Sequence, residues 1–195
     1  MLEKSLKWQE TSSFILEWLK APLVTASILP SSQKLAQHMV KDLPPQANTV
    51  IELGPGTGVF TRQLLEHGIA ESSLVLIELN TRFARKLKQS YPQATIINGA
   101  AEALSHLNIK QADAVISGLP FLSMRDQQIE QILRSSFSVL KQKGVFVQFT
   151  YGYRCPAKPH ILQQTGLSAK RATVVLGNFP PASVYHFRKK VPTQT

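Results

Sequence analysis

The sequence predicts an α/β protein whose mostly parallel sheet is covered by helices on both faces. Three observations support this prediction. Apolar, strand-like segments alternate with amphipathic helical segments through the middle of the chain. A glycine-rich loop follows the first of these strands and precedes a helix. The length of 195 residues and the hydrophobic content of 43% fit one folded domain of ordinary size.

Five strands and four helices are expected in the alternating part of the chain. The strands cover residues 49–53, 74–79, 94–97, 112–117 and 144–150, and the helices cover residues 57–67, 81–91, 100–107 and 126–141. Helical crossovers between consecutive strands are the usual connection between parallel strands, so this order predicts parallel pairing.

Two further strands are expected beyond the alternating part. A short helix at residues 159–165 leads into β-rich segments at residues 170–176 and 183–188. The connecting residues 177–181 read Gly-Asn-Phe-Pro-Pro, which is typical of a turn. The two segments therefore predict an antiparallel hairpin that closes one edge of the sheet and brings the number of strands to seven.

Residues 1–44 are expected to form a helical segment ahead of a sheet domain that covers residues 45–190. The second helix of this segment begins at Ser31 or Ser32, both suitable N-caps, and runs to Lys41. The first helix carries large apolar side chains on one arc, namely Trp8, Phe14, Ile15, Trp18 and Leu19. This arc packs on the sheet in one interpretation. In the other it lies in a membrane interface, because tryptophan beside lysine is typical of interfacial helices.

The net charge of +10 is concentrated in the last third of the chain. Residues 1–130 carry 12 Lys and Arg against 12 Asp and Glu, whereas residues 131–195 carry 10 Lys and Arg and no acid. A basic region of this kind predicts an anionic partner. The charge alone does not choose between nucleic acid and an anionic membrane surface.

The cysteine and histidine content argues against a disulfide framework or a zinc site. Cys155 is the single cysteine and the five histidines are scattered, so no metal-ligand spacing occurs. We therefore expect no metal and a reducing, cytoplasmic compartment. No apolar segment approaches the roughly 20 residues needed to span a bilayer.

The loop after the first strand carries Gly54, Gly56 and Gly58 in the spacing Gly-x-Gly-x-Gly. Glycine allows a sharp turn and a close approach of a ligand to the backbone. The spacing differs from Gly-x-Gly-x-x-Gly, and no Gly-Lys-Ser/Thr follows, which argues against a phosphate-binding P-loop. Glu78 stands 20 residues after Gly58 at the end of the second strand, where a carboxylate can accept both hydroxyls of a ribose.

Glu52, the three loop glycines and Glu78 together resemble the cofactor site of class I S-adenosylmethionine-dependent methyltransferases, which have a Rossmann-like sheet. The resemblance covers residues 45–188. It implies that the glycine loop wraps the amino-acid part of S-adenosylmethionine, that Glu52 lies behind the loop and that Glu78 binds the ribose. A nicotinamide-binding Rossmann domain is the alternative for the loop alone. The glycine spacing and the missing second nucleotide-binding half disfavour it.

The adenine site departs from the pattern of this family, which often has Gly-Asp-Ala after the third strand. Residues 98–102 read Asn-Gly-Ala-Ala-Glu, and Ala100 cannot accept a hydrogen bond from the adenine amino group. Either Glu102 takes that place, or the Ala101 backbone and Asn98 frame the base. The cofactor-binding residues that the resemblance implies are Glu52, Gly54, Gly56, Thr57, Gly58, Glu78, Leu79, Ala101, Glu102 and Ser117.

The segment after the fourth strand bears on the acceptor of the methyl group. Adenine-N6 methyltransferases carry Asn/Asp/Ser-x-Pro-Tyr/Phe here, and the related rRNA adenine dimethylases carry Asn-Leu-Pro-Tyr. Aligning Leu119, Pro120 and Phe121 with that pattern puts Gly118 in place of the asparagine, and Ser117 is one residue out of place. The side-chain acceptor for the base is therefore absent. RNA adenine-N6 methylation, with Phe121 stacking on the base, is the alternative function.

Four motifs resemble the peripheral bacterial phospholipid N-methyltransferases, a family that methylates phosphatidylethanolamine stepwise to phosphatidylcholine. They are Ile-Glu-Leu-Gly-Pro-Gly-Thr-Gly at 51–58, Ser-Gly-Leu-Pro at 117–120, Gln-Phe-Thr-Tyr-Gly at 148–152 and Pro-Pro-Ala-x-Val-Tyr-x-Phe at 180–187. The resemblance implies a phospholipid substrate and attachment to anionic membranes through the N-terminal helix. It also implies a cytoplasmic enzyme at the inner face of the cell membrane. A cofactor-binding protein without turnover is the non-enzymatic alternative.

The implied chemistry needs no metal, because the methyl group passes directly from a sulfonium to an aligned and desolvated amine. The expected acceptor site is the turn of Gly118, Leu119 and Pro120, whose carbonyl oxygens can accept hydrogen bonds from an amine. Tyr151 is the catalytic candidate among the side chains, and Tyr153 and His160 are weaker candidates. Headgroup contact is expected from a basic set formed by Arg154, Lys158, Lys170, Arg171, Arg188, Lys189 and Lys190.

Overall fold

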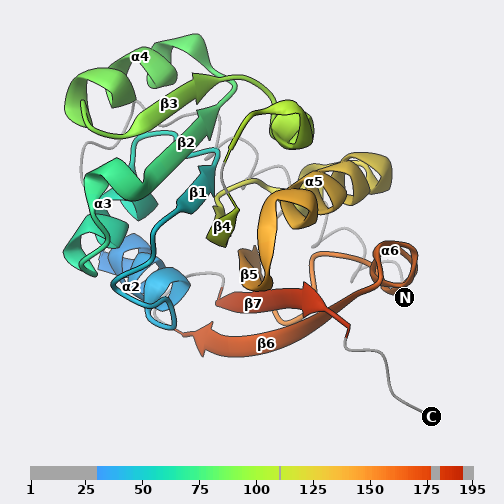
Figure 1. Cartoon of the computed structure of the whole chain (residues 1–195). Coiled ribbons are helices and arrows are strands. Elements are labelled where there is room, and N and C mark those ends of the chain that lie inside the picture. The colour runs from blue at the N-terminus through green and yellow to red at the C-terminus, as the bar shows by residue number, and fades with distance from the viewer. Residues whose placement is uncertain (1–29, 110, 177–180, 191–195) are drawn as a thin grey trace.

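The computed structural model describes residues 30–109, 111–176 and 181–190, and a seven-stranded sheet runs through the middle of this part of the chain (Figure 1). The strand order is β3-β2-β1-β4-β5-β7-β6. The strands are β1 Val50–Leu53, β2 Leu74–Glu78, β3 Thr95–Asn98, β4 Ala112–Ser117, β5 Leu140–Tyr151, β6 Leu167–Val175 and β7 Ala182–Lys189. β1 to β5 pair in parallel, as the sequence predicts.

Helices cover both faces of the sheet, which confirms the predicted layers (Figure 1). They are α2 Pro30–Val40, α3 Val59–Glu66, α4 Thr81–Ser90, α5 Asp126–Val139 and α6 Pro159–Thr165, with short 3-10 helices η1 Glu71–Ser73, η2 Ala101–His106 and η3 Phe121–Ser123. One buried cluster joins the sheet to α2, α3 and α4 through residues such as Leu64 and Leu87. The other joins it to η2, α5 and α6 through residues such as Ile132 and Ile161.

The antiparallel hairpin at one edge of the sheet is also confirmed. β7 pairs antiparallel with both β5 and β6, so the last strand of the hairpin lies inside the sheet and β6 forms its edge. The predicted connecting turn falls largely on residues 177–180 and the predicted first N-terminal helix falls within residues 1–29. Both lie outside the described residues.

Two predicted helices differ from the structure. The segment 100–107 forms the 3-10 helix η2 rather than an α-helix. The helix predicted to reach residue 141 ends at Val139, because Leu140 has extended backbone angles, is 2% exposed and pairs with Ala112 as the first residue of β5. Core burial and strand pairing at Leu140 therefore override the local helical pattern.

The amino ends of β1, β4 and β5 are joined by the carboxylate of Asp113. Its Oδ2 accepts hydrogen bonds from the backbone N–H groups of Asn48, at 2.9 Å, and Thr49, at 3.2 Å, and its Oδ1 accepts from Nζ of Lys141. Desolvation opposes ionisation of this carboxyl group, but the hydrogen bonds from Lys141 and the two backbone groups outweigh it and lower the pKa of Asp113. Asp113 is thus an ionised clamp at the end of the sheet opposite the glycine loop.

We expect the substitution Asp113→Asn to lower the free energy of unfolding by about 1–2 kcal/mol at pH 7, because it removes a charge-assisted clamp. The pKa of Asp113 is lowered in the folded protein. The stabilisation is therefore present above the ordinary carboxyl pKa of about 3.9 and is lost as the pH falls through the folded-state pKa. Urea unfolding at pH 7 and at acidic pH measures the difference between the two proteins, which should shrink in acid.

Asp126→Asn is the matched control, because it removes an exposed ion pair with Lys158 at 2.9 Å. Exposed ion pairs contribute little, so this variant should unfold close to wild type at pH 7. Equal losses in the two variants would contradict the role of Asp113 as a clamp.

Candidate active site

The loops after β1 and β4 touch at two glycines. A Cβ added to Gly54 would lie 2.8 Å from Cδ2 of Leu119, and a Cβ added to Gly118 would lie 2.8 Å from the carbonyl oxygen of Gly54. Gly54 also has a φ of 66°, in the left-handed region that favours glycine. A larger residue at Gly118 must therefore push the two loop backbones apart, whereas one at Gly54 must displace the side chain of Leu119 and adopt a strained φ.

The tip of the glycine loop faces open space. A Cβ added to Gly56 would meet no heavy atom within 4 Å. Thr57 is exposed beside it, and Gly58 leads into α3 with a φ of 79°. The loop thus leaves an uncovered stretch of backbone that a ligand can approach closely.

The carboxylate of Glu78 at the end of β2 is bound against this loop. Its Oε2 accepts a hydrogen bond from the backbone N–H of Gly56 at 2.9 Å, and its Oε1 accepts from the N–H of Asn80 at 2.8 Å. A carboxylate oxygen has two lone-pair sites, so each oxygen keeps one for a hydroxyl group. The neighbouring Leu79 is 73% exposed and offers an apolar surface at the same place.

Glu52 lies in β1 just before the glycine loop and is fully buried. Its Oε2 accepts a hydrogen bond from the hydroxyl of Thr61 at 2.6 Å, while its Oε1 has no partner. Burial raises the pKa of Glu52 to about 8. The hydrogen bonds with Thr61 partly oppose this rise, and the nearby charge of Glu78 adds to it. A cation bound nearby would favour the ionised form, so Glu52 is suited to a positively charged ligand.

The residues predicted for adenine lie beyond β3. Nδ2 of Asn98 donates to the carbonyl oxygen of Glu78 at 2.8 Å, and its Oδ1 accepts from the hydroxyl of Thr81 at 2.9 Å. Asn98 therefore joins the tips of β2 and β3 with both ends of its amide engaged. Ala101 is buried and Glu102 is partly buried at the start of η2, and their contact with adenine stays a prediction.

In the turn after β4, two of the three carbonyl groups of residues 118–120 already accept hydrogen bonds within the protein. The carbonyl oxygen of Leu119 accepts from the N–H of Phe121 at 3.0 Å and from Nε2 of Gln148 at 2.9 Å, and that of Pro120 accepts from the N–H of Ser123 at 2.8 Å. No described residue donates to the carbonyl oxygen of Gly118. Of the three carbonyl groups predicted to meet an amine, that of Leu119 is therefore saturated and that of Gly118 is free within the described part.

Ser117, at the end of β4, is fully buried, and its Oγ accepts from the N–H of Leu119 at 3.3 Å. The predicted contact of Ser117 with the cofactor stays a prediction. Its hydrogen bond with Leu119 gives Ser117 a local role in shaping the turn after β4.

Gln148 is a site residue that the sequence analysis did not single out. It is fully buried in β5 beside Ser117, and its Nε2 donates to the carbonyl oxygens of Leu119 and Phe149, the latter at 2.8 Å. Its Oε1 is buried without a partner. The available signal was a polar amide inside the otherwise apolar run 145–149. Gln148 fixes the turn after β4 against β5.

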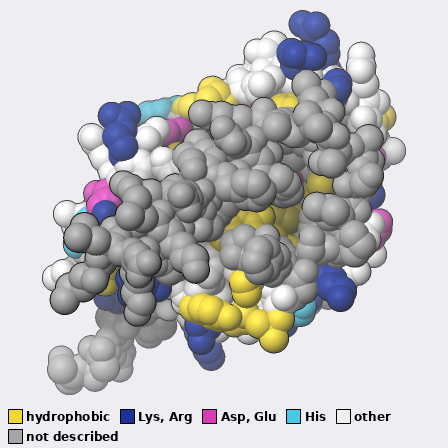
Figure 2. Space-filling view, turned by 180° about the vertical axis from the view of Figure 1, so that it is seen from behind, with side chains coloured by type: hydrophobic (Ala, Val, Ile, Leu, Met, Phe, Trp, Pro, Cys, Tyr) yellow, Lys and Arg dark blue, Asp and Glu magenta, His cyan; other side chains and the backbone are white. Residues whose placement is uncertain are grey.

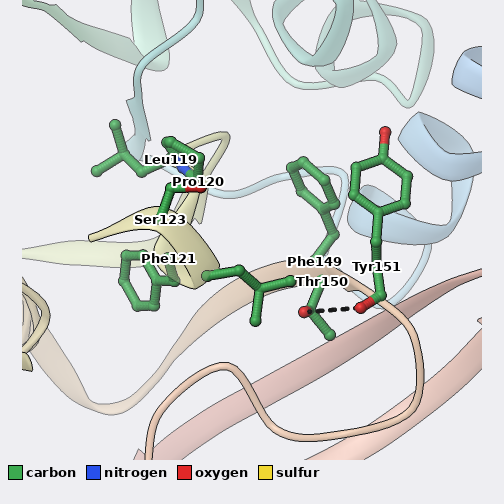
Figure 3. A pocket seen from close by; sticks show the side chains of 8 residues that line it. Leu119, Pro120, Phe121, Ser123, Phe149, Thr150 and Tyr151 are labelled. Atoms are coloured by element: carbon green, nitrogen blue, oxygen red, sulfur yellow. Dashed lines mark hydrogen bonds between the residues drawn. The ribbon is translucent and has the colours of Figure 1, made fainter. Parts of the chain in front are cut away.

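An apolar pocket lies beside this turn (Figure 3). The side chains that line it include neither an acid nor a base: Leu119, Pro120, Phe121, Leu122, Ser123, Phe149, Thr150 and Tyr151. Burial raises the pKa of Tyr151 above its ordinary value of 10.0, so its phenol is protonated at neutral pH and is a weak base. The predicted residues Leu119, Pro120 and Tyr151 thus meet at one pocket, in surroundings that favour the neutral form of an amine.

The two weaker candidates do not line this pocket. Tyr153 is 56% exposed, and its carbonyl oxygen accepts from the hydroxyl of Tyr185 at 2.6 Å. His160 is exposed on α6, with Nε2 3.3 Å from the carboxylate of Asp126. Elsewhere in the described ranges, no three His, Cys, Asp or Glu side chains are grouped so that they could hold a metal ion.

The basic set does not form one surface. Arg154 and Lys158 follow β5, whose carboxyl end lies beside the pocket. Arg188 and Lys189 lie at the opposite end of the sheet, because antiparallel β7 returns there and Arg188 donates to the carbonyl oxygen of Lys143 at 2.8 Å. Figure 2 shows Lys and Arg side chains at several separate places on the face that it views. Arg188 and Lys189 therefore lie away from the pocket, contrary to the expectation that the whole basic set contacts the headgroup.

Known proteins are similar to this chain in sequence. A family model described as a methyltransferase domain matches residues 50–144. An ornithine lipid N-methyltransferase from Singulisphaera acidiphila is 30% identical over 145 residues, which cover 70% of this chain and 76% of that protein. A probable dimethyladenosine transferase from Dictyostelium discoideum is 26% identical over 161 residues, which cover 78% of this chain and 45% of that protein.

Solved structures share the fold. A 1,6-didemethyltoxoflavin-N1-methyltransferase from Burkholderia thailandensis, with S-adenosylhomocysteine bound, superposes with a TM-score of 0.67 at 15% identity and covers 92% of this chain and 87% of its own. A TehB-like S-adenosylmethionine-dependent methyltransferase from Corynebacterium glutamicum superposes with a TM-score of 0.62 at 16% identity. The superposition covers 93% of this chain and 99% of that protein.

The chain belongs to the S-adenosylmethionine-dependent methyltransferases. Its cofactor is S-adenosylmethionine, and the residues around the glycine loop fit that molecule. The open backbone at Gly56 leaves room for it, the free lone pairs of Glu78 suit its ribose, and the unpartnered Oε1 of Glu52 suits its positive charge. Within the described residues, no helix is long and apolar enough to cross a membrane.

The pKa of Glu52 predicts proton release on cofactor binding. Below about pH 8 the free protein holds Glu52 protonated, and a cationic ligand favours its ionised form, so binding expels a proton and tightens as the pH rises towards 8. Between pH 6.5 and 8 we expect the affinity of wild type for S-adenosylmethionine to rise up to about tenfold more than that of Glu52→Gln. Calorimetry in two buffers of different ionisation enthalpy measures the released proton. Equal release by both proteins would show that Glu52 does not titrate.

Gln148 provides a second prediction. The substitution Gln148→Leu removes two donated hydrogen bonds together with one unpaired buried oxygen, so the stability should change by less than about 2 kcal/mol. The carbonyl oxygen of Leu119 loses its hydrogen bond from Gln148, so the turn is held less firmly against β5. Methyl transfer should then fall about tenfold or more, because the reacting groups are less well aligned. Thermal unfolding and turnover are measured together. A loss of stability without a loss of turnover in the folded protein would contradict this role.

Proposed function

We propose that the protein N-methylates the amine of a membrane phospholipid, with phosphatidylethanolamine as the acceptor, at the surface of an anionic membrane. The observation that carries this proposal is an apolar rim formed by Leu79, Leu122, Tyr153 and Leu176, which are 73%, 52%, 56% and 74% exposed. These residues follow β2, β4, β5 and β6, and all four strands end at the same edge of the sheet as the active site. Large exposed apolar groups along the edge that carries a site favour a lipid or protein surface as its partner.

Charge at the same edge supports an anionic lipid surface. Arg154 and Lys158 follow β5 in the segment next to Tyr153, and Arg171 donates from β6 to the carbonyl oxygen of Tyr153 at 3.3 Å. A basic residue close to an anionic membrane contributes about 1 kcal/mol. The relative from Singulisphaera acidiphila is named as a lipid N-methyltransferase, which is the same class of reaction.

The pocket supplies the conditions that the reaction needs. S-adenosylmethionine provides an electrophilic methyl group on a sulfonium, and its C–S bond breaks as the new N–C bond forms. The lining residues exclude water from the amine and favour its neutral, nucleophilic form. The carbonyl oxygen of Gly118, next to the lining residue Leu119, accepts no hydrogen bond from a described residue and is our candidate acceptor for an amine N–H, while Gln148 holds the turn against β5. The proton of the ammonium leaves to water before the amine enters the pocket.

RNA adenine methylation is the second candidate, because the relative from Dictyostelium discoideum is named as a dimethyladenosine transferase. Gly118 offers no side chain to hold the amino group of a base, and Phe121 is 2% exposed, with its ring packed against Phe146 at a centroid distance of 6.1 Å. A ring buried in this way has little surface left for stacking on a base. These contacts favour the lipid acceptor.

The test uses the full chain and radiolabelled S-adenosylmethionine. Acceptors are phosphatidylglycerol vesicles with phosphatidylethanolamine, the same vesicles with ornithine lipid, and ribosomal RNA. We expect label in phosphatidylethanolamine. Label in ornithine lipid alone would replace the acceptor while keeping the class of reaction. Label in RNA without any label in lipid would overturn the proposal.

Three variants, of which two form a matched pair, test the membrane-facing edge. Leu122→Ser and Arg154→Gln change the edge that carries the pocket, whereas Lys189→Gln changes the opposite end of the sheet. Each of the first two should weaken co-sedimentation with anionic vesicles about threefold to tenfold, and Lys189→Gln should have less effect. Binding of S-adenosylmethionine should be unchanged in all three. Equal losses for Arg154→Gln and Lys189→Gln would contradict the orientation proposed here.

A further inference from the structure

Three aromatic rings form a row from the cofactor loop to the acceptor pocket. Phe60, at the start of α3, and Phe149 lie edge to face with ring centroids 5.8 Å apart, and Phe149 and Tyr151 lie edge to face at 5.6 Å. The ring of Phe60 also reaches Gly118, since a Cβ added to Gly118 would be 3.6 Å from its Cε2. We call Phe60, Phe149 and Tyr151 the aromatic row.

The row is partly exposed and lies at the pocket. All three rings pack on the cluster that joins the sheet to α2, α3 and α4 without being fully buried. Figure 3 shows the rings of Phe149 and Tyr151 side by side and projecting to the same side of β5. Successive rings are turned by 76° and 88°, so the row presents π faces in two perpendicular directions.

Among the described side chains that line the pocket, none carries a negative charge that would stabilise a cation. Its lining includes no carboxylate, and the carbonyl group of Leu119 is already saturated. N-methylation nevertheless moves a positive charge to the acceptor, because the amine nitrogen becomes an ammonium as the sulfonium becomes a neutral thioether. Aromatic faces attract substituted ammonium groups through the negative charge of the π system.

We propose that the aromatic row binds the substituted ammonium that forms at the acceptor nitrogen, and that it favours acceptors already carrying methyl groups. This inference rests on the proposed function, since it requires an amine acceptor. A neutral amine gains little from the rings, whereas the developing cation gains more, and that difference accelerates transfer. Each added methyl group also makes the ammonium less hydrated, so the interaction with the rings strengthens from the first transfer to the last.

The experiment compares three acceptors in phosphatidylglycerol vesicles: phosphatidylethanolamine and its N-methyl and N,N-dimethyl derivatives. The variants are Phe149→Leu and Tyr151→Leu, which remove a ring while keeping an apolar side chain. Tyr151→Phe keeps the ring and removes the hydroxyl. Phe137→Leu is the matched control, because Phe137 stacks on Phe146 in the other buried cluster and does not line the pocket.

We expect Phe149→Leu and Tyr151→Leu to lower turnover of the dimethyl acceptor about threefold to tenfold more than turnover of phosphatidylethanolamine. Inhibition by phosphatidylcholine, the quaternary product, should weaken by a similar factor. Tyr151→Phe should keep the wild-type preference among the three acceptors, because the ring remains, and Phe137→Leu should keep both the preference and the turnover of wild type. The inference is overturned if both ring-removing variants keep the wild-type acceptor preference, or if Tyr151→Phe loses as much as Tyr151→Leu.

A binding measurement separates this inference from the proposed function. Tetramethylammonium is titrated with the protein in the presence of S-adenosylhomocysteine, and its methyl proton resonance is followed. Contact with ring faces should shift this resonance upfield with wild type and less with Phe149→Leu. If no lipid is methylated but the shift is present, the lipid acceptor fails and the cation site stands. If wild type produces no shift, the cation site fails whatever the acceptor.

Discussion

The active site depends on the contact between the backbones of the loops after β1 and β4. Gly118 donates its N–H to the carbonyl oxygen of Leu53 at 2.8 Å and Gly54 donates to that of Ile77 at 2.9 Å, so sheet-like hydrogen bonds continue beyond the strand ends. With no side chains between Gly54 and Gly118, the surface that receives the cofactor and the surface that receives the acceptor are separated by backbone alone. Direct transfer of a methyl group requires this proximity, because the reacting atoms must nearly touch.

The polar groups around this contact are incompletely satisfied. Glu52 and Gln148 are both fully buried, and each has one side-chain oxygen without a partner. An unpaired buried oxygen costs stability, of the order of 1–3 kcal/mol. Both lie in strands on either side of β4, next to the loops that meet at Gly118. The site therefore contains buried polar atoms that have no hydrogen-bond partner within the described protein. Such atoms are common at functional sites, where binding is favoured over stability.

The fold could be predicted from the sequence because its signals are local. Strand and helix segments alternate, and the glycines and Glu78 stand where a strand ends. The site was harder to predict. Gln148 opens one of the four motifs, but only three-dimensional pairing reveals that its amide binds the carbonyl group of Leu119. The position of Arg188 and Lys189 depends on the direction of β7. A count of charges along the sequence cannot detect this direction, so it grouped basic residues that lie at opposite ends of the sheet.

The insertion of β7 between β5 and β6 has a consequence for synthesis of the protein. While the ribosome is still adding residues 182–189, β5 exposes an unpaired edge and β6 has no neighbour in the sheet. Unpaired edges invite association with other chains. In β7 the hydroxyl of Tyr185 donates a hydrogen bond to the carbonyl oxygen of Tyr153, and that of Ser183 donates to the carbonyl oxygen of Gly152, each at 2.6 Å. The nascent chain therefore cannot form a finished acceptor pocket until β7 has emerged, which delays activity until nearly the whole domain has been made.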